Sequence, residues 1–242
     1  MSKIGIFDSG LGGLTVLNNF LEKYPNNDYI FVSDSKNFPY GEKSKEELLS
    51  CASKIISFFL SINVDTIVIA CNTLSSLILE DLKRKYSEVN IVGVIESTIS
   101  KVLEYDNKNV LVLATLNTVN SLVYKNEIER NSNNKVFQVA TDLAFLIETE
   151  SPYLEEKVKD YLSYYKDIDI IVLGCTHYKL VLDIIKKYSN ALIVSSSDEV
   201  SSFVNLSNDS EGSVLVYTTG DVDVFCKKCK KYFFSLVSFL DL

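Results

Sequence analysis

The sequence has little of what a secreted, membrane-spanning or histidine-rich metal protein needs. Its 242 residues include one histidine, His177, which argues against a metal site built on several histidines. No apolar run is long enough to span a bilayer. Asp8 comes too early in the chain for the apolar core of a signal peptide. We therefore expect a cytoplasmic protein with no metal and no membrane partner.

Positive charge is also in short supply. Lysine and arginine number 24 against 32 aspartates and glutamates, so the net charge is −8. Nucleic acids and anionic membranes are bound through basic surfaces. We expect no nucleic-acid partner. A small anionic substrate is still compatible with this charge, because local hydrogen-bond donors can outweigh the overall field.

Only three prolines are present, and no low-complexity linker divides the chain. Short runs rich in Ile and Val alternate with longer amphipathic stretches, which is typical of an α/β fold with helices covering a mostly parallel sheet. The predicted strands are residues 3–7, 29–32, 66–70, 91–95, 110–113, 170–173, 191–194 and 214–217. The predicted helices include residues 43–60, 75–86, 119–128, 153–165 and 178–188. Residues 131–134 and 195–197 are predicted surface turns.

An internal repeat indicates how these elements are organised. Residues 64–73 (VDTIVIACNT) resemble residues 168–177 (IDIIVLGCTH), with Asp, Ile, Val and Cys in register. A weaker similarity links residues 3–15 with 109–119. The alternative explanation is that buried α/β strands look alike, but strand composition does not account for the aligned cysteines. We expect two related α/β halves, each with a cysteine at the carboxyl end of a strand.

Five cysteines in a cytoplasmic chain favour free thiols over disulfides, because the number is odd. Cys71 and Cys175 each precede a predicted helix, whose N-terminal N–H groups should lower the thiol pKa. A buried structural role is the common alternative for any single cysteine. Inverting a stereocentre next to a carboxylate needs a base on one face and an acid on the other. Two pseudo-symmetric thiols meet that need.

Other polar residues follow the predicted strands, where ligands of α/β sheets bind. Asn72, Thr73 and Thr176, with nearby backbone N–H groups, could bind a carboxylate on which charge develops. Asp8, before a glycine-rich turn, could contact a substrate ammonium or assist Cys71, or could simply be a helix cap. His177 could assist Cys175 as an acid–base partner, or be a plain core histidine.

A further candidate segment runs from Asp34 to Gly41 (DSKNFPYG) after another predicted strand. It is either a plain Pro-Tyr-Gly loop or a loop that covers a substrate and supplies Tyr40 and the Gly41 backbone.

Taken together, these motifs resemble those of glutamate racemases, within the aspartate/glutamate racemase superfamily, and the resemblance runs from end to end. The motifs are GIFDSGLGGL (5–14), PYGEKS (39–44), ACNT (70–73), GCTH (174–177) and TGD (219–221). The resemblance implies two pseudo-symmetric domains with the site between them. It implies direct deprotonation of glutamate by Cys71 and Cys175 without pyridoxal phosphate or another cofactor, and entry of the D-glutamate into peptidoglycan.

The resemblance also implies site residues and an assembly. The substrate-contacting residues would be Asp8, Ser9, Tyr40, Gly41, Asn72, Thr73, Thr176 and His177. Such enzymes are commonly homodimers whose C-terminal segment returns to the first domain, which predicts domains of residues 1–94 plus 204–242 and of residues 95–203.

One segment departs from the family's pattern. A proline-containing apolar stretch ending in glutamate is usual in the second domain, but residues 143–148 (LAFLIE) lack the proline. Glu148 is the best match to the acid that supports the second-domain thiol, with Glu150 as an alternative. A solvated glutamate at a helix end is the plainer interpretation.

Three other functions compete with this one. The turn after the first strand, with Asp34 ending the second, imitates a dinucleotide-binding fingerprint, but the third glycine is missing. Cys226 and Cys229 form a lone Cys-x-x-Cys, which is weak support for a metal site and is better explained by a helix with an exposed lysine face, followed by an apolar tail (233–237) docked in the core. The third alternative is a racemase for aspartate, which would differ from a glutamate racemase only in the depth of its pocket and in the hydrogen-bond donors there.

Overall fold

The computed structural model describes residues 2–204, 206, 212–232 and 238–241, and its strands form two parallel sheets. The larger sheet has the order β10-β9-β2-β1-β3-β4. The smaller has the order β6-β5-β7-β8. The strands of the larger sheet are β1 (Lys3–Asp8), β2 (Asp28–Ser33), β3 (Thr66–Ile69), β4 (Asn90–Gly93), β9 (Val214–Thr218) and β10 (Ser238–Asp241). Those of the smaller are β5 (Asn109–Ala114), β6 (Lys135–Ala140), β7 (Ile170–Gly174) and β8 (Leu192–Ser195).

The expected internal repeat is present in the topology. The order β2-β1-β3-β4 in one sheet matches β6-β5-β7-β8 in the other. Phe7 pairs with Ile69, and Ala114 pairs with Gly174. Cys71 therefore follows the end of β3 much as Cys175 follows the end of β7. The predicted α/β fold with two pseudo-symmetric halves is confirmed.

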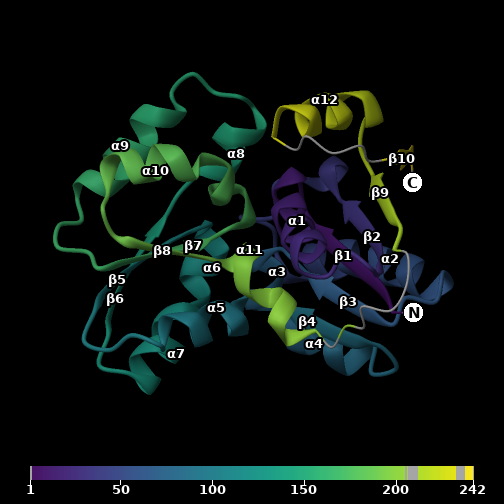
Figure 1. Ribbon diagram of the computed structural model, residues 1–242, viewed down its shortest axis with the longest axis horizontal. Coiled ribbons are helices and arrows are strands. Elements are labelled where there is room, and N and C mark those ends of the chain that lie inside the picture. Colours follow the sequence, from purple (N-terminus) through teal and green to yellow (C-terminus); the bar gives the residue numbers. More distant parts are fainter. Residues whose placement is uncertain (1, 205, 207–211, 233–237, 242) are drawn as a thin grey trace.

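Helices cover both faces of each sheet (Figure 1). The first half contains η1 (Leu11–Gly13), α1 (Leu14–Lys23), η2 (Ser35–Asn37), α2 (Lys45–Ser61), α3 (Asn72–Leu77) and α4 (Leu79–Lys85). Next come α5 (Ile95–Val102), α6 (Leu116–Ser121), α7 (Val123–Asn131), α8 (Leu143–Glu148), α9 (Leu154–Ser163), η3 (Thr176–Val181) and α10 (Leu182–Tyr188). The chain returns through α11 (Ser196–Glu199), η4 (Val200–Phe203) and α12 (Val222–Tyr232). No helix of the described residues is long and apolar enough to cross a membrane.

The alternating side chains of the central strand hold these layers together. Ile4 and Ile6 of β1 belong to the apolar cluster beneath α1. Phe7 points to the opposite cluster, where it packs against Phe59 of α2 with ring centroids 6.4 Å apart. Burying both faces stabilises the strand and places its last residue at the rim of the sheet.

Local signals set the helix boundaries. Helix α2 begins with a complete capping box, in which Ser44 and Glu47 satisfy each other's backbone N–H groups. The predicted helix over 75–86 is two helices that meet at Ile78, whose backbone is not helical. The predicted helix over 119–128 likewise divides into α6 and α7 at Leu122, where φ is 57°.

Several other predictions need correction. The prediction missed β6 and β10, and the strand expected over 91–95 ends at Gly93 because helix α5 begins at Ile95. The surface turn at 195–197 is wrong. Ser196 and Ser197 are fully buried between the halves, where Ser196 accepts a hydrogen bond from Asn72 and Ser197 lies 2.6 Å from the Thr15 hydroxyl.

Helix α12 confirms the helix that was predicted around Cys226 and Cys229, with lysines on its exposed face. Lys227 and Lys230 are exposed, as predicted, whereas Lys228 is partly buried. Cys229 is 5% exposed and belongs to the same apolar cluster as Phe225. The tail at 233–237, predicted to dock in the core, lies outside the described residues.

Candidate active site

A cavity of about 590 Å³ lies at the carboxyl ends of the strands of both halves. All the predicted site residues except Glu148 line it. They are Asp8, Ser9, Tyr40, Gly41, Cys71, Asn72, Thr73, Cys175, Thr176 and His177. The structure therefore brings together residues from four separate segments of the sequence.

The two cysteines occupy equivalent places in this cavity. Cys71 is the N-cap residue of α3, and Cys175 is the N-cap residue of η3. Their exposed fractions are 6% and 7%. The predicted lowering of the pKa is wrong for Cys71. Burial and the charge of Asp8 raise its pKa far above the usual value, and they outweigh the helix N–H groups of Leu74 and Thr73.

Asp8 connects the two halves at the floor of the cavity. Its carboxylate accepts hydrogen bonds from the Thr176 hydroxyl at 2.8 Å, the Gly10 N–H at 3.1 Å and the Ser9 hydroxyl at 3.1 Å. Burial raises the pKa of Asp8, although the charge of His177 and these hydrogen bonds act in the opposite direction. Asp8 is thus a buried acid beside both thiol-bearing segments.

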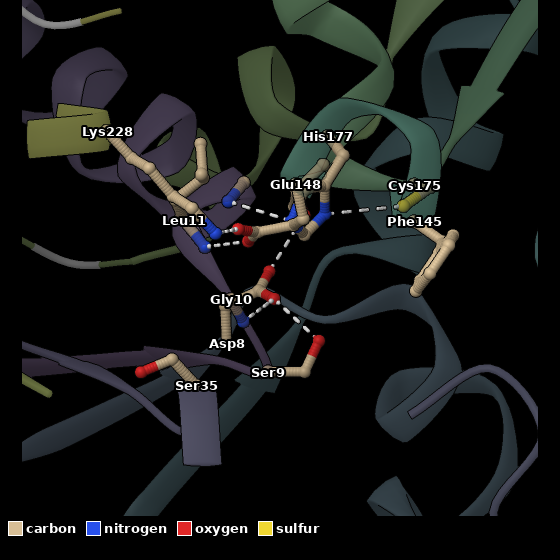
Figure 2. A network of polar contacts seen from close by, with 12 residues as sticks. Asp8, Ser9, Gly10, Leu11, Ser35, Phe145, Glu148, Cys175, His177 and Lys228 are labelled. Carbon is tan, nitrogen blue, oxygen red and sulfur yellow. Dashed lines mark hydrogen bonds and ion pairs between the residues drawn. The ribbon is translucent and has the colours of Figure 1, made fainter. Parts of the chain in front are cut away.

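His177 and Glu148 form a buried pair next to Cys175 (Figure 2). His177 Nδ1 lies 3.8 Å from Cys175 Sγ, and Nε2 lies 3.0 Å from Glu148 Oε1. Burial favours the neutral imidazole, but the contacts with Cys175 and Glu148 raise the His177 pKa to about 10. Burial likewise opposes charge on Glu148, yet the hydrogen bond and charge of His177, with smaller contributions from Lys228 and the Leu11 N–H, lower its pKa to about 2. The contacts with Glu148 and Cys175 therefore favour the imidazolium form of His177.

The alternative acid lies elsewhere. Glu150 is exposed and has a left-handed backbone with φ of 51°, just beyond the end of α8. Glu148 is 9% exposed and contacts His177. The interpretation of Glu148 as a solvated residue at a helix end is therefore wrong.

The glycine-rich turn after β1 lets Glu148 and His177 lie close to its backbone, which gives its glycines a role other than dinucleotide binding. A Cβ atom on Gly10 would lie 2.5 Å from Glu148 Oε1 and 2.9 Å from His177 Nε2. A side chain at this position would push the acid away from the histidine. The turn thus permits the histidine–glutamate pair to form against it.

Asp34, the acid of the apparent dinucleotide fingerprint, already has hydrogen-bond partners within the protein. Asp34 is 2% exposed and accepts hydrogen bonds from the Tyr40 hydroxyl, from Asn37 at 3.0 Å and from Thr219 at 2.6 Å. Tyr40 therefore contributes its ring to the cavity while its hydroxyl is used internally. Burial first, and then Asp34, raise the pKa of that hydroxyl. The TGD motif near the C-terminus supports this loop.

The residues after Cys71 are more constrained than the sequence indicated. The Asn72 amide accepts a hydrogen bond from the Tyr124 hydroxyl at 2.7 Å and donates one to Ser196 at 2.8 Å. The Thr73 hydroxyl lies 2.9 Å from that of Thr115. The Asn72 side chain is thus hydrogen-bonded to two residues of the second half, although Asn72 also lines the cavity.

Sequence reasoning missed three contributors, namely Thr115, Tyr124 and Lys228. Thr115 follows β5 as Ser9 follows β1, so the weak similarity of 3–15 with 109–119 could have located it. Tyr124 and Lys228 reach the site from distant segments, and no local pattern marks them. Within the described residues, no group of three or more His, Cys, Asp or Glu side chains is placed to hold a metal ion.

Comparisons with known proteins agree with this arrangement. The Asp/Glu/Hydantoin racemase family matches residues 14–199. A glutamate racemase of Fusobacterium nucleatum is 35% identical over 95% of this chain and 93% of its own length. The structure of a Bacillus anthracis glutamate racemase isoform matches with a TM-score of 0.91 at 28% identity, covering 100% of this chain and 97% of that one. A Francisella tularensis glutamate racemase in complex with D-glutamate matches with a TM-score of 0.87 at 27% identity, covering 100% and 97% of the two chains. This chain is a racemase that belongs to the Asp/Glu/Hydantoin racemase family.

Proposed function

We propose that this enzyme interconverts L-glutamate and D-glutamate without a cofactor, using Cys71 and Cys175 as its two proton-transferring groups. The observation that carries the proposal is that both cysteines line one cavity from equivalent strand ends of the two halves. A pseudo-symmetric site of this kind offers a similar group to each face of a bound substrate.

In the proposed reaction, the thiolate of one cysteine removes the α-proton from one face of glutamate. The electron pair left on the α-carbon delocalises into the substrate carboxylate. The thiol of the other cysteine then returns a proton on the opposite face, so the number of protons is unchanged and the stereocentre is inverted. Backbone N–H groups in the segments of Asn72, Thr73 and Thr176 would stabilise the charge that develops on the carboxylate.

Asp8 and His177 would prepare the two thiols. Burial, together with the charge of Asp8, raises the pKa of Cys71, which keeps this group a thiol that can donate a proton. A substrate ammonium placed beside Asp8 would offset that charge and favour the thiolate. On the other side, a protonated His177 can donate its Nδ1–H to the Cys175 sulfur. We assign the supporting acid to Glu148 because it contacts His177.

The lining of the cavity supports chemistry without pyridoxal phosphate. That cofactor is held by a lysine through a Schiff base. None of the described residues that line the cavity is a lysine. Direct deprotonation is therefore the chemistry that these side chains can perform.

Glutamate is the proposed substrate because the relatives described above are glutamate racemases, one of them in complex with D-glutamate. An aspartate racemase remains the alternative within the family. We further propose that the enzyme works in the cytoplasm as a homodimer and supplies D-glutamate for peptidoglycan. The proposed domains are residues 1–94 plus 204–242 and residues 95–203.

The two-cysteine proposal is tested by replacing each thiol separately. Cys71→Ala and Cys175→Ala should each nearly abolish racemisation, because each removes one of the two proton carriers. Cys226→Ala is the matched control, since this cysteine lies on α12 outside the cavity. Circular dichroism of L- and D-glutamate solutions follows the reaction. Full activity in either single variant would refute the mechanism, and activity on aspartate alone would change the substrate.

A further inference from the structure

The Cys-x-x-Cys segment near the C-terminus contains a lysine that reaches the proposed active site. Lys228 lies on α12, which contacts the η1 turn of the first half. Its Nζ atom is 2.8 Å from Oε2 of Glu148 (Figure 2). The side chain of Lys228 is 27% exposed and that of Glu148 is 9% exposed. This is a shielded ion pair rather than a surface one.

With Lys228 in place, both oxygens of Glu148 are occupied. Oε1 accepts the Leu11 N–H at 2.9 Å and faces His177 Nε2 at 3.0 Å, while Oε2 pairs with Lys228. The carboxylate is therefore fixed at both ends. Its orientation decides where the imidazole ring points, and the other nitrogen of that ring faces Cys175.

We propose that Lys228 is a positioning residue for the Cys175 side of the active site. By holding Oε2 of Glu148, it keeps Oε1 directed at His177 Nε2, so that Nδ1 stays directed at the Cys175 sulfur. The inference depends on the proposed function, because Cys175 must be a proton carrier for this orientation to affect the rate.

The electrostatic surroundings fit this role. Among the described residues, the titratable groups around the pair are His177 and Cys175 on the β7–η3 segment, Asp8 on β1, and Cys229 beside Lys228 on α12. Glu148 is ionised despite its burial, and Lys228 is one of the groups that lower its pKa. Without the lysine, a buried carboxylate would have one oxygen unpaired, which favours protonation or reorientation.

A purely structural role for Lys228 makes a different prediction. If the lysine only attached α12 to the rest of the fold, its loss would lower the thermal stability and leave His177 unchanged. If it acted only as a nearby positive charge, its loss would raise the His177 pKa. If it positions Glu148, its loss weakens the Glu148–His177 contact and the His177 pKa falls.

The experiment compares Lys228→Met, which keeps the apolar stem, with Lys228→Arg, which keeps the charge. Lys227→Met is the matched control, because Lys227 is the exposed neighbour on the same helix. Two quantities are measured in the full chain. One is kcat and KM for both enantiomers over a range of pH. The other is the His177 pKa from NMR of the imidazole, which gives a single set of signals because the chain has one histidine.

We expect Lys228→Met to lower kcat about 10-fold, the loss expected for a charged hydrogen bond. The acidic limb of its pH profile should move to higher pH, because Glu148 becomes easier to protonate, and the His177 pKa should fall. Lys228→Arg should restore most of each change, and Lys227→Met should alter none. An unchanged or raised His177 pKa in Lys228→Met overturns the proposal. So does lower stability with unchanged kcat.

If Lys228→Met does not fold, Lys228→Gln replaces it as the neutral variant. Its amide removes the charge but can still donate a hydrogen bond, which helps the fold to tolerate the change. The NMR measurement separates this inference from the proposed function. Wild-type enzyme that is inactive on glutamate contradicts the proposed function, whereas the His177 pKa in the variants still shows whether Lys228 holds Glu148.

Discussion

Thr176 donates a 2.8 Å hydrogen bond to Asp8, so the residue after Cys175 in the second half is tied to an acid of the first half. Both residues are buried. The contact joins the end of β1 in the first half to the segment after β7 that carries Cys175. A buried hydrogen bond therefore connects the two halves beside the proposed reaction site.

Thr176→Val removes this hydrogen bond and keeps the shape of the side chain. We expect kcat/KM to fall about 10-fold, because the buried Asp8 carboxylate loses a donor and its position. Ser97→Ala is the control, since Ser97 is also buried and its hydroxyl donates a hydrogen bond to the Val94 carbonyl within its own segment. Equal activity in the two variants would show that the contact does not serve catalysis.

Tyr124→Phe removes a single hydroxyl that holds the Asn72 amide from the opposite half. We expect KM to rise, because the N–H groups after Cys71 lose their fixed position. Tyr29→Phe is a matched control: Tyr29 is fully buried, and its hydroxyl bonds to the Tyr24 carbonyl near the amino end of β2, away from the cavity. Steady-state kinetics and thermal unfolding of both variants separate the effect on binding from a general loss of stability.

Gly10→Ala should impair the site through a steric clash, because its Cβ would lie 2.5 Å from Glu148 Oε1. We expect lower kcat and a lower His177 pKa, as the acid is pushed away. Gly5→Ala is the comparison, since its Cβ would lie 2.9 Å from a ring atom of Phe59 in the core. That change should cost stability and leave the His177 pKa as it is. A His177 pKa that moves equally in both would contradict the account.

The Glu148–His177 pair makes a pH-dependent contribution to folding. The His177 pKa rises from 6.5 to about 10, so its contribution is complete below pH 6.5 and is lost as pH rises through 10. The Glu148 pKa falls from 4.5 to about 2, so its contribution is complete above pH 4.5 and is lost as pH falls through 2. The pair is therefore most stabilising between pH 4.5 and 6.5.

Urea unfolding of the wild type and of His177→Gln tests this contribution. The difference in unfolding free energy should be largest near about pH 6 and should shrink by about pH 10.5. Titrating groups that do not interact with His177 cancel in the difference between the two proteins. A difference that does not change with pH would contradict the raised pKa.

Much of the fold was readable from the sequence because buried parallel strands have a distinct composition. The two aligned cysteine motifs also located the site, since equivalent strand ends lie at the same edge of a sheet. Strand β6 escaped notice because it is an edge strand with a mixed exposure pattern, in which only Val136 is buried. The buried serines at 195–197 appeared to be a surface turn because their partners lie far away in the sequence.

The chemistry at individual residues was less predictable, because it depends on non-local contacts. The N-cap position of Cys71 correctly indicated donors that lower its pKa, but the larger effect of burial was not visible in the sequence. Tyr40 and Asn72 were expected to face a substrate, yet their side chains bond to Asp34 and to the second half. Lys228 reaches Glu148 across 80 residues, a pairing that no spacing rule indicates.

The central claim is tested most directly by circular dichroism of reduced, cofactor-free enzyme with L-glutamate in D₂O. The account predicts that the ellipticity decays to zero and that deuterium appears at the α-carbon of the product. Unchanged ellipticity and no α-deuterium with glutamate would contradict it.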